Sequence, residues 1–205
     1  EYGRISLIAK GAKRNKKKQG LNYNLYQEYL MKWVNKSELG VLIDTELATI
    51  MTSMSPNEIM TGFYMNEIIL RLLHKHEPHP ELFDTYNTTI KELSNNNTDQ
   101  VLIRYFEKKL LQSLGYGMIF DLDLNTGKEI VAENKYYYKL DFGPTSNSDD
   151  NKSVIPISGK TLIDLGNETL TDIKNKNEAK ILLRSLLNQY LGEKPLASRK
   201  LYQEY

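Results

Sequence analysis

The chain contains 205 residues, 40% hydrophobic and 26% charged, which is the composition of a globular protein with one large domain or two small ones. Lysine plus arginine number 27 and aspartate plus glutamate 26, so a net charge of +1 predicts no field over the whole protein. The absence of cysteine excludes a disulfide scaffold, a cysteine-ligated zinc site and thiol catalysis, and the apolar runs are too short to predict a membrane span.

The first part of the chain predicts β-strands around a basic loop. Residues 4–10, 25–34 and 39–51 have the residue types of strands. Between the first two, residues 11–20 contain almost no apolar side chain, which predicts a solvated loop. Residues 1–20 carry a local charge of +6, and the basic residues are Arg4, Lys10, Lys13, Arg14, Lys16, Lys17 and Lys18.

This basic segment is the strongest candidate for nucleic-acid binding. Cations neutralise phosphates, and aromatic rings such as those of Tyr26, Tyr29 and Trp33 can stack on the bases of a single strand. The alternative is an ordinary solvated loop, with the aromatic rings serving in cross-strand packing.

A helical region is predicted from residue 55 onward. Ser55 and Glu58 form a capping box with Pro56 at the first helical position, and the predicted helix continues to about His76. Apolar residues at helical spacing predict a second helix over 80–93 and a third, capped by Thr98, that ends near Leu114.

The remainder predicts a hairpin followed by helices. Residues 118–124 and 136–142 alternate around a turn at 125–127, which predicts an inserted hairpin. Asn177 is the predicted cap of a helix that reaches Leu191, and 196–205 predict a short terminal helix. We therefore expect an α+β protein with two domains, residues 1–54 and 55–205.

Three other patterns bear on possible chemistry. His74, His76 and His79 lack the spacing of a helical zinc site. Ser158–Thr161 resembles the tail of a phosphate-binding loop, but Val154 stands where that motif needs glycine, so no nucleotide cofactor is expected. The hairpin aspartates Asp121, Asp123 and Asp141 could bind a metal ion, although exposed hairpin acids are more common.

Five stretches in order along the chain resemble the bacterial recombination mediator RecO family. They are residues 1–14, 62–73, 81–86, 104–107 together with 114–117, and 190–201, the last reading YLGEKPLASRKL. The resemblance implies an N-terminal OB-fold β-barrel followed by a mainly helical domain. It also implies a non-enzymatic protein of the bacterial cytoplasm, associated with the nucleoid.

The resemblance further implies binding of single- and double-stranded DNA, annealing of complementary strands and help in loading recombinase onto DNA covered by single-stranded-DNA-binding protein (SSB). The implied partners are RecR and the acidic C-terminal tail of SSB. Many members of the family carry four zinc-binding cysteines after the Leu-Gly-Tyr motif. The corresponding segment here, 118–157, has none, so the chain resembles a metal-free branch. By family analogy the barrel begins about 25 residues earlier, so we expect it to be incomplete here.

The acidic tail of SSB needs cations beside an apolar pocket. The predicted helices offer Arg71 and Arg104, and the second lies within a stretch that matches the family. The alternative for Arg104 is a structural ion pair with Glu107 or Glu67. Two other functions stay open: a metal-dependent nuclease that uses the hairpin aspartates or the histidines, and a protein scaffold whose basic loop is incidental.

Overall fold

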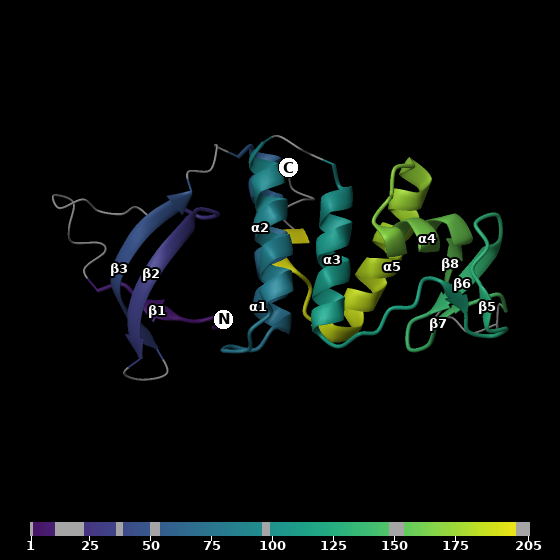
Figure 1. Ribbon diagram of the computed structural model, residues 1–205, viewed down its shortest axis with the longest axis horizontal. Coiled ribbons are helices and arrows are strands. Elements are labelled where there is room, and N and C mark those ends of the chain that lie inside the picture. The colour runs from purple at the N-terminus through teal and green to yellow at the C-terminus, as the bar shows by residue number, and fades with distance from the viewer. Residues whose placement is uncertain are drawn as a thin grey trace. The chain divides into compact units, whose positions relative to one another are not determined.

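The computed structural model describes residues 2–10, 23–35, 39–49, 54–95, 99–147 and 154–199 (Figure 1). Two compact units divide the chain: one takes residues 1–66 and 73–97, the other 67–72 and 98–205. The boundary predicted near residue 55 falls between a strand and a helix, whereas the first unit also includes most of that helix and the next one. Several predicted features lie outside the described residues: Lys13, Arg14, Lys16, Lys17, Lys18, the cap Thr98 and residues 200–205.

The first unit contains a three-stranded sheet in the order β1-β3-β2, with β1 at Leu7–Ile8, β2 at Glu28–Asn35 and β3 at Gly40–Thr49. β3 pairs in parallel with β1 and antiparallel with β2. The three strands expected in this region are therefore confirmed, with shorter bounds. Among the described residues they form an open sheet in which no barrel closes, so the expected OB-fold is not confirmed.

The first unit also contains α2 at Pro80–Ser94 and most of α1 at Pro56–Leu72, whose residues from 67 onward belong to the second unit. The predicted capping box is confirmed, because the Glu58 carboxylate accepts a hydrogen bond from the Ser55 N–H while the Ser55 hydroxyl accepts one from the Glu58 N–H. The Tyr26 hydroxyl donates to the Ile59 carbonyl at 3.2 Å. This bond joins the turn before β2 to the first turns of α1.

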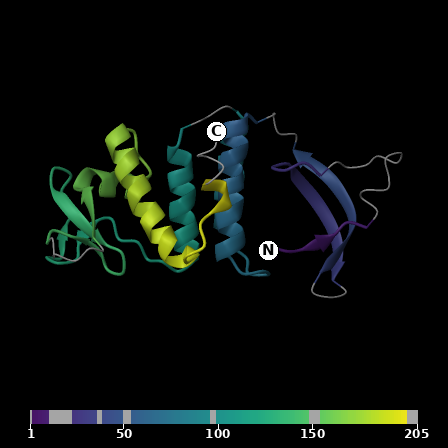
Figure 2. The ribbon, with the colours of Figure 1, turned by 180° about the vertical axis from the view of Figure 1, so that it is seen from behind.

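The second unit is built on α3 at Val101–Ser113 and α5 at Ile173–Leu191, which lie side by side (Figures 1 and 2). Their fully buried apolar residues form its core: Phe106, Leu110, Leu111, Leu182, Leu183, Leu186 and Leu187. The predicted start of α5 was wrong. Asp172 is the cap, because its carboxylate accepts from the N–H groups of Lys174 and Asn175, so the helix begins four residues before Asn177.

The segment between α3 and α5 is more elaborate than the expected hairpin. β4 (Leu122–Asp123) pairs with β5 (Lys128–Glu129), and a separate antiparallel sheet has the order β7-β6-β8, from Gly143–Thr145, Lys135–Lys139 and Val154–Ser158. The pairing expected between 118–124 and 136–142 is therefore wrong. Strand β8 leads directly into α4, Gly159–Asn167, which packs against α5.

Candidate anion-binding site

The basic residues of the N-terminal segment were the first predicted site, and two of them lie in the described part of the chain. Arg4 donates from Nη2 to the Leu73 carbonyl at 3.0 Å, so its guanidinium contacts the chain just after α1. Lys10 is exposed just beyond β1. The other five predicted DNA-binding residues fall between positions 11 and 22, outside the described residues. The role of this segment in DNA binding stays a prediction.

Arg71, a predicted partner-binding residue, is engaged within the second unit. Its Nη1 and Nη2 donate to the carbonyls of Lys194 and Pro195 at 2.6 and 2.9 Å, and Nη2 lies 3.5 Å from the Glu67 carboxylate. A guanidinium with these contacts holds the C-terminal segment against the last turns of α1. Its donors are largely used before any partner arrives.

Arg104 lies on α3 with only 3% of its surface exposed. Its Nη1 lies 2.7 Å from the carboxylate of Glu107, one turn along the helix and fully buried. The structural alternative considered for Arg104 is therefore present. The pair does not use all the donors of the guanidinium, because neither Nη1 nor Nε is aligned to donate a hydrogen bond within the described part of the chain.

Two cations that the sequence analysis did not single out join Arg104 from the neighbouring helix. Lys180 and Arg184 lie one turn apart on α5, both partly buried. Burial, Arg184 and Arg104 together hold the pKa of the Lys180 ammonium below its ordinary value, and Glu107 offsets this effect only in part. Burial is the largest cause, and the two guanidiniums that follow it lie near Lys180. We call Arg104, Lys180 and Arg184 the α3–α5 cation cluster, in which Arg104 pairs with Glu107.

Helical periodicity explains why these cations gather at the edge of the core. Leu182, Leu183, Leu186 and Leu187 occupy the buried face of α5, so positions 180 and 184 fall at its margin. A cation there can extend its charged end toward solvent while its stem covers apolar surface. The i, i+4 spacing of a lysine and an arginine beside a leucine stripe was the sequence signal. The sequence could not indicate that α3 supplies the third cation.

The positive charge of these side chains determines what the cluster can bind. A carboxylate or phosphate would neutralise it and could accept charge-assisted hydrogen bonds. Ile181, next to Lys180 on α5, exposes 57% of its surface and offers an apolar contact beside the cations. Cations next to an exposed aliphatic side chain suit an acidic ligand that also has an apolar group.

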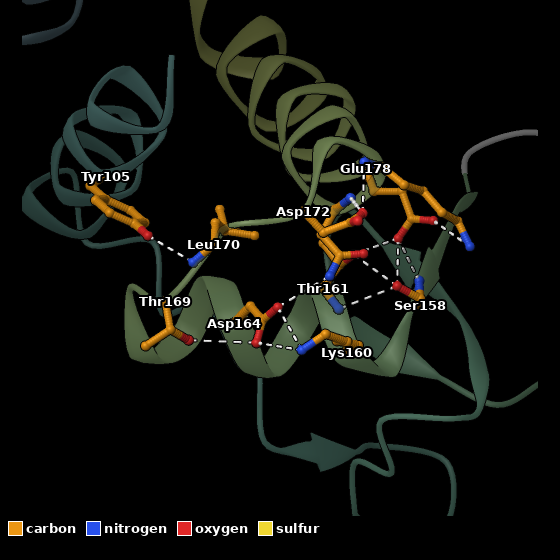
Figure 3. Close-up of polar contacts among 11 residues, drawn as sticks. Tyr105, Ser158, Lys160, Thr161, Asp164, Thr169, Leu170, Asp172 and Glu178 are labelled. Atoms are coloured by element: carbon orange, nitrogen blue, oxygen red, sulfur yellow. Dashed lines mark hydrogen bonds and ion pairs between the residues drawn. The ribbon is translucent and has the colours of Figure 1, made fainter. Parts of the chain in front are cut away.

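A second polar cluster lies where β8 runs into α4, and there the negative charge is already supplied. The Glu178 carboxylate from α5 accepts hydrogen bonds from the hydroxyls of Ser158 and Thr161 and from the Ser158 N–H, at 2.6–2.9 Å (Figure 3). These residues belong to the Ser158–Thr161 fragment that resembles a phosphate-binding loop. The internal carboxylate occupies the helix start where such a loop would hold phosphate.

Two of the residues considered for metal binding, Asp123 and His79, have polar neighbours within the chain. Asp123 accepts hydrogen bonds from the Asn125 and Ser146 N–H groups and from the Thr126 hydroxyl, so it stabilises the turn after β4. His79 lies 3.8 Å from Glu77. Across the described ranges, no group of three or more histidine, aspartate or glutamate side chains could hold a metal ion.

No helix among the described residues is long and apolar enough to cross a bilayer.

Residues 55–200 match the family model described as the C-terminal part of recombination protein O. The chain is also similar to curated relatives, each named DNA repair protein RecO. The relative from Nitrosospira multiformis is 35% identical over 99% of this chain and 84% of its own length. The one from Methylococcus capsulatus is 33% identical over 98% of this chain and 82% of its length. With 35% identity to the Nitrosococcus oceani relative as well, over the whole of this chain and 83% of that protein, the chain belongs to the RecO family.

Proposed function

We propose that the chain is a non-enzymatic mediator of recombinational DNA repair. It binds single- and double-stranded DNA, anneals complementary strands and helps to load recombinase onto DNA covered by SSB, with RecR as a further partner. Membership of the RecO family supports this proposal, since the relatives are named DNA repair proteins.

The single structural observation that carries the proposal is the α3–α5 cation cluster. Three cations lie close enough together for Arg184 and Arg104 to lower the pKa of Lys180, and Ile181 is exposed next to Lys180 on α5. An acidic peptide that ends in an apolar residue and a free carboxylate matches this surface, because its charges are neutralised while its apolar side chain is buried. We therefore propose that the acidic C-terminal tail of SSB binds at this cluster.

The cluster assigns different roles to the arginines considered from sequence. Lys180 and Arg184 are accessible enough to contact the tail directly, while the buried Arg104 contributes its charge from behind. Arg71 donates to two main-chain carbonyls, so it is a weaker candidate for tail binding.

DNA binding is assigned to the basic N-terminal segment. Arg4, Lys10 and the loop cations Lys13, Arg14, Lys16, Lys17 and Lys18 would neutralise phosphates and release counterions. Two strands brought onto one basic surface repel each other less, which allows annealing without nucleotide hydrolysis.

One assay tests both assignments: annealing of labelled complementary strands in EDTA, with the strands either naked or covered by SSB. Replacing Lys180 and Arg184 together by alanine should slow annealing of covered strands by about tenfold or more, the equivalent of one charge-assisted hydrogen bond. The same variant should anneal naked strands normally. Replacing Lys16, Lys17 and Lys18 by alanine should slow both reactions and lower the salt slope of DNA binding by about 0.7–0.9 for each phosphate that the variant no longer neutralises.

Lys174→Ala is the matched control, because Lys174 lies on α5 with 74% of its side chain exposed and pairs with Glu178. Equal rates for the Lys180/Arg184 variant and wild type on covered strands would remove the tail from this cluster. Strand cleavage that stops in EDTA would favour a metal-dependent nuclease.

A further inference from the structure

The β4–β5 pair is too short to be stable by itself. Each of its strands contains two residues, and the pair forms a sheet separate from β6, β7 and β8. An isolated two-stranded ribbon is at best marginally stable in water even when it is longer. Contacts outside the pair must therefore fix its turn, residues 124–127, on the rest of the second unit.

A structural zinc ion does not fit this part of the chain. The resemblance to the family implies zinc-binding cysteines in the corresponding segment of many members, but residues 118–157 contain neither cysteine nor histidine. These are the side chains that build most structural zinc sites. Within the described ranges 118–147 and 154–157, no group of three or more carboxylates could hold a metal ion. Groups other than a metal ion therefore hold the turn.

The carboxylate of Asp123, which is 4% exposed, supplies the attachment. It accepts hydrogen bonds from the Asn125 N–H at 2.9 Å, the Thr126 hydroxyl at 2.8 Å and the Ser146 N–H at 3.2 Å. The first two donors lie within the turn, whereas Ser146 follows β7 and lies 23 residues away in the sequence. One carboxylate thus joins the β4–β5 turn to the end of β7. We call these four residues the Asp123 cluster.

The hydrogen bonds of the Asp123 cluster outweigh the cost of burying its charge. Burial raises the pKa of the Asp123 carboxyl, but the bonds from Ser146, Thr126 and Asn125 bring the net pKa below its ordinary value. The carboxylate is therefore ionised at neutral pH. A buried charge is costly unless polar partners surround it, so the cluster is favourable only while the turn and the end of β7 stay together.

Main-chain packing beside the Asp123 cluster brings the same two parts into contact. The Leu124 N–H donates to the Pro144 carbonyl at 2.9 Å. Gly143, the first residue of β7, has a φ of +123°, and a Cβ there would lie 2.8 Å from Cδ1 of Leu124. Glycine satisfies both the backbone conformation and the close approach. The turn therefore packs directly on β7.

We infer that the Asp123 cluster performs in this chain the structural task of a metal site, because it fixes the segment after α3 through bonds that converge on one buried centre. An anion collects N–H and O–H donors, where a zinc cation would collect thiolates. The order of this segment therefore depends neither on zinc nor on the oxidation state of thiols. The inference is independent of the proposed function, and it assigns to the cluster a carboxylate that a hairpin metal site would need.

Amide hydrogen exchange of the full chain, followed residue by residue by NMR, tests the inference. Asp123→Asn should speed exchange of the Asn125 and Ser146 amides about fivefold or more, because charge-assisted hydrogen bonds give way to neutral ones. The core amides of α3 and α5 should keep their wild-type rates. Wild type should exchange at the same rates in EDTA and with equimolar zinc.

Two further variants separate the Asp123 cluster from a general effect of charge. Asp121→Asn is the matched control, because it removes the same charge from an exposed residue two positions away, and it should change these rates by less than about twofold. Thr126→Val keeps the Asp123 charge and removes one donor. It should speed exchange of the Ser146 amide about twofold, and it should add little to Asp123→Asn, since both act through the same carboxylate.

Four outcomes would overturn the inference. Exchange at Asn125 and Ser146 might be unchanged in Asp123→Asn, or Asp121→Asn could accelerate it equally. Slower exchange of the segment with added zinc would assign its order to a metal ion. Equal acceleration of the α3 and α5 amides would make Asp123 a determinant of the whole unit rather than of this segment. If Asp123→Asn does not fold, Thr126→Val decides, and an unchanged Ser146 rate in that variant refutes the inference.

Discussion

Two polar clusters of the second unit both involve α5, and they differ in how their charge is balanced. At the start of α4 a single carboxylate, Glu178, receives hydrogen bonds from Ser158 and Thr161 (Figure 3). At the α3–α5 cation cluster Arg104 pairs with Glu107, and Arg104 and Arg184 lie near enough to Lys180 to lower its pKa. The first cluster gathers hydrogen-bond donors around one carboxylate, and the second brings like charges close together.

The difference teaches which cluster stabilises the fold and which is available to a ligand. Burial raises the pKa of the Glu178 carboxyl. The hydrogen bonds from Thr161 and Ser158 lower it by more than burial raises it, so the net pKa lies below the ordinary value. The folded state therefore prefers the ionised carboxylate. In the cation cluster the pKa of Lys180 is lowered by burial and by the repulsion of like charges, and an added anion would relieve that repulsion.

The largest expected effect concerns the buried ion pair inside the cation cluster. Arg104→Met should lower the free energy of unfolding by about 3 kcal/mol, because it leaves the buried Glu107 carboxylate without its nearest cation. Adding Glu107→Leu should recover most of this loss, since no buried charge then lacks a partner. Urea unfolding of the two single variants and the double variant measures the coupling; additive losses would contradict the pairing.

Breaking the first cluster, around Glu178, should cost somewhat less. Glu178→Gln should lower the free energy of unfolding by about 2 kcal/mol at neutral pH, because charge-assisted hydrogen bonds to two hydroxyls and one N–H are weakened. The pKa of Glu178 is lowered in the folded state, so the stabilisation is present above the unfolded value and is lost as the pH falls through the folded value.

Denaturant unfolding at neutral and acidic pH checks this expectation, with Lys174→Ala as the exposed control that should change stability by less than about 0.5 kcal/mol. Tail-peptide affinity should not change in Glu178→Gln. A pH-independent difference in stability, or weakened peptide binding, would erase the distinction between the two clusters.

The smallest expected effect is a pH dependence of binding at the cation cluster. An anion favours the protonated form of Lys180, whose pKa is lowered in the free protein by burial and by Arg184 and Arg104, and raised in part by Glu107. Affinity for the acidic peptide should be constant below that lowered pKa and should fall as the pH rises through it.

Lys180→Arg should flatten this decline, because arginine stays charged at high pH. Anisotropy titrations from neutral to alkaline pH compare the two proteins. Parallel profiles would mean that Lys180 does not contact the bound anion.

Local sequence determined the helices of the first unit and the apolar faces of α3 and α5. The Ser55–Glu58 capping box places both of its hydrogen bonds within four residues, so the sequence predicted it and the structure confirms it. The start of α5 was predicted too late, because Asn177 and Asp172 are both acceptable caps by residue type. The N–H groups that Asp172 accepts from decide between them.

Tertiary structure alone decided the charge balance that separates the two polar clusters. Arg104 meets Lys180 and Arg184 across more than 70 residues of sequence, and Glu67 meets Ser198 across 131. Glu178 reaches the start of α4 only because α5 packs on that helix. Residue type and spacing identify cations and carboxylates, but helix packing determines which charges neutralise each other, because electrostatic interaction depends on distance and burial rather than on sequence order.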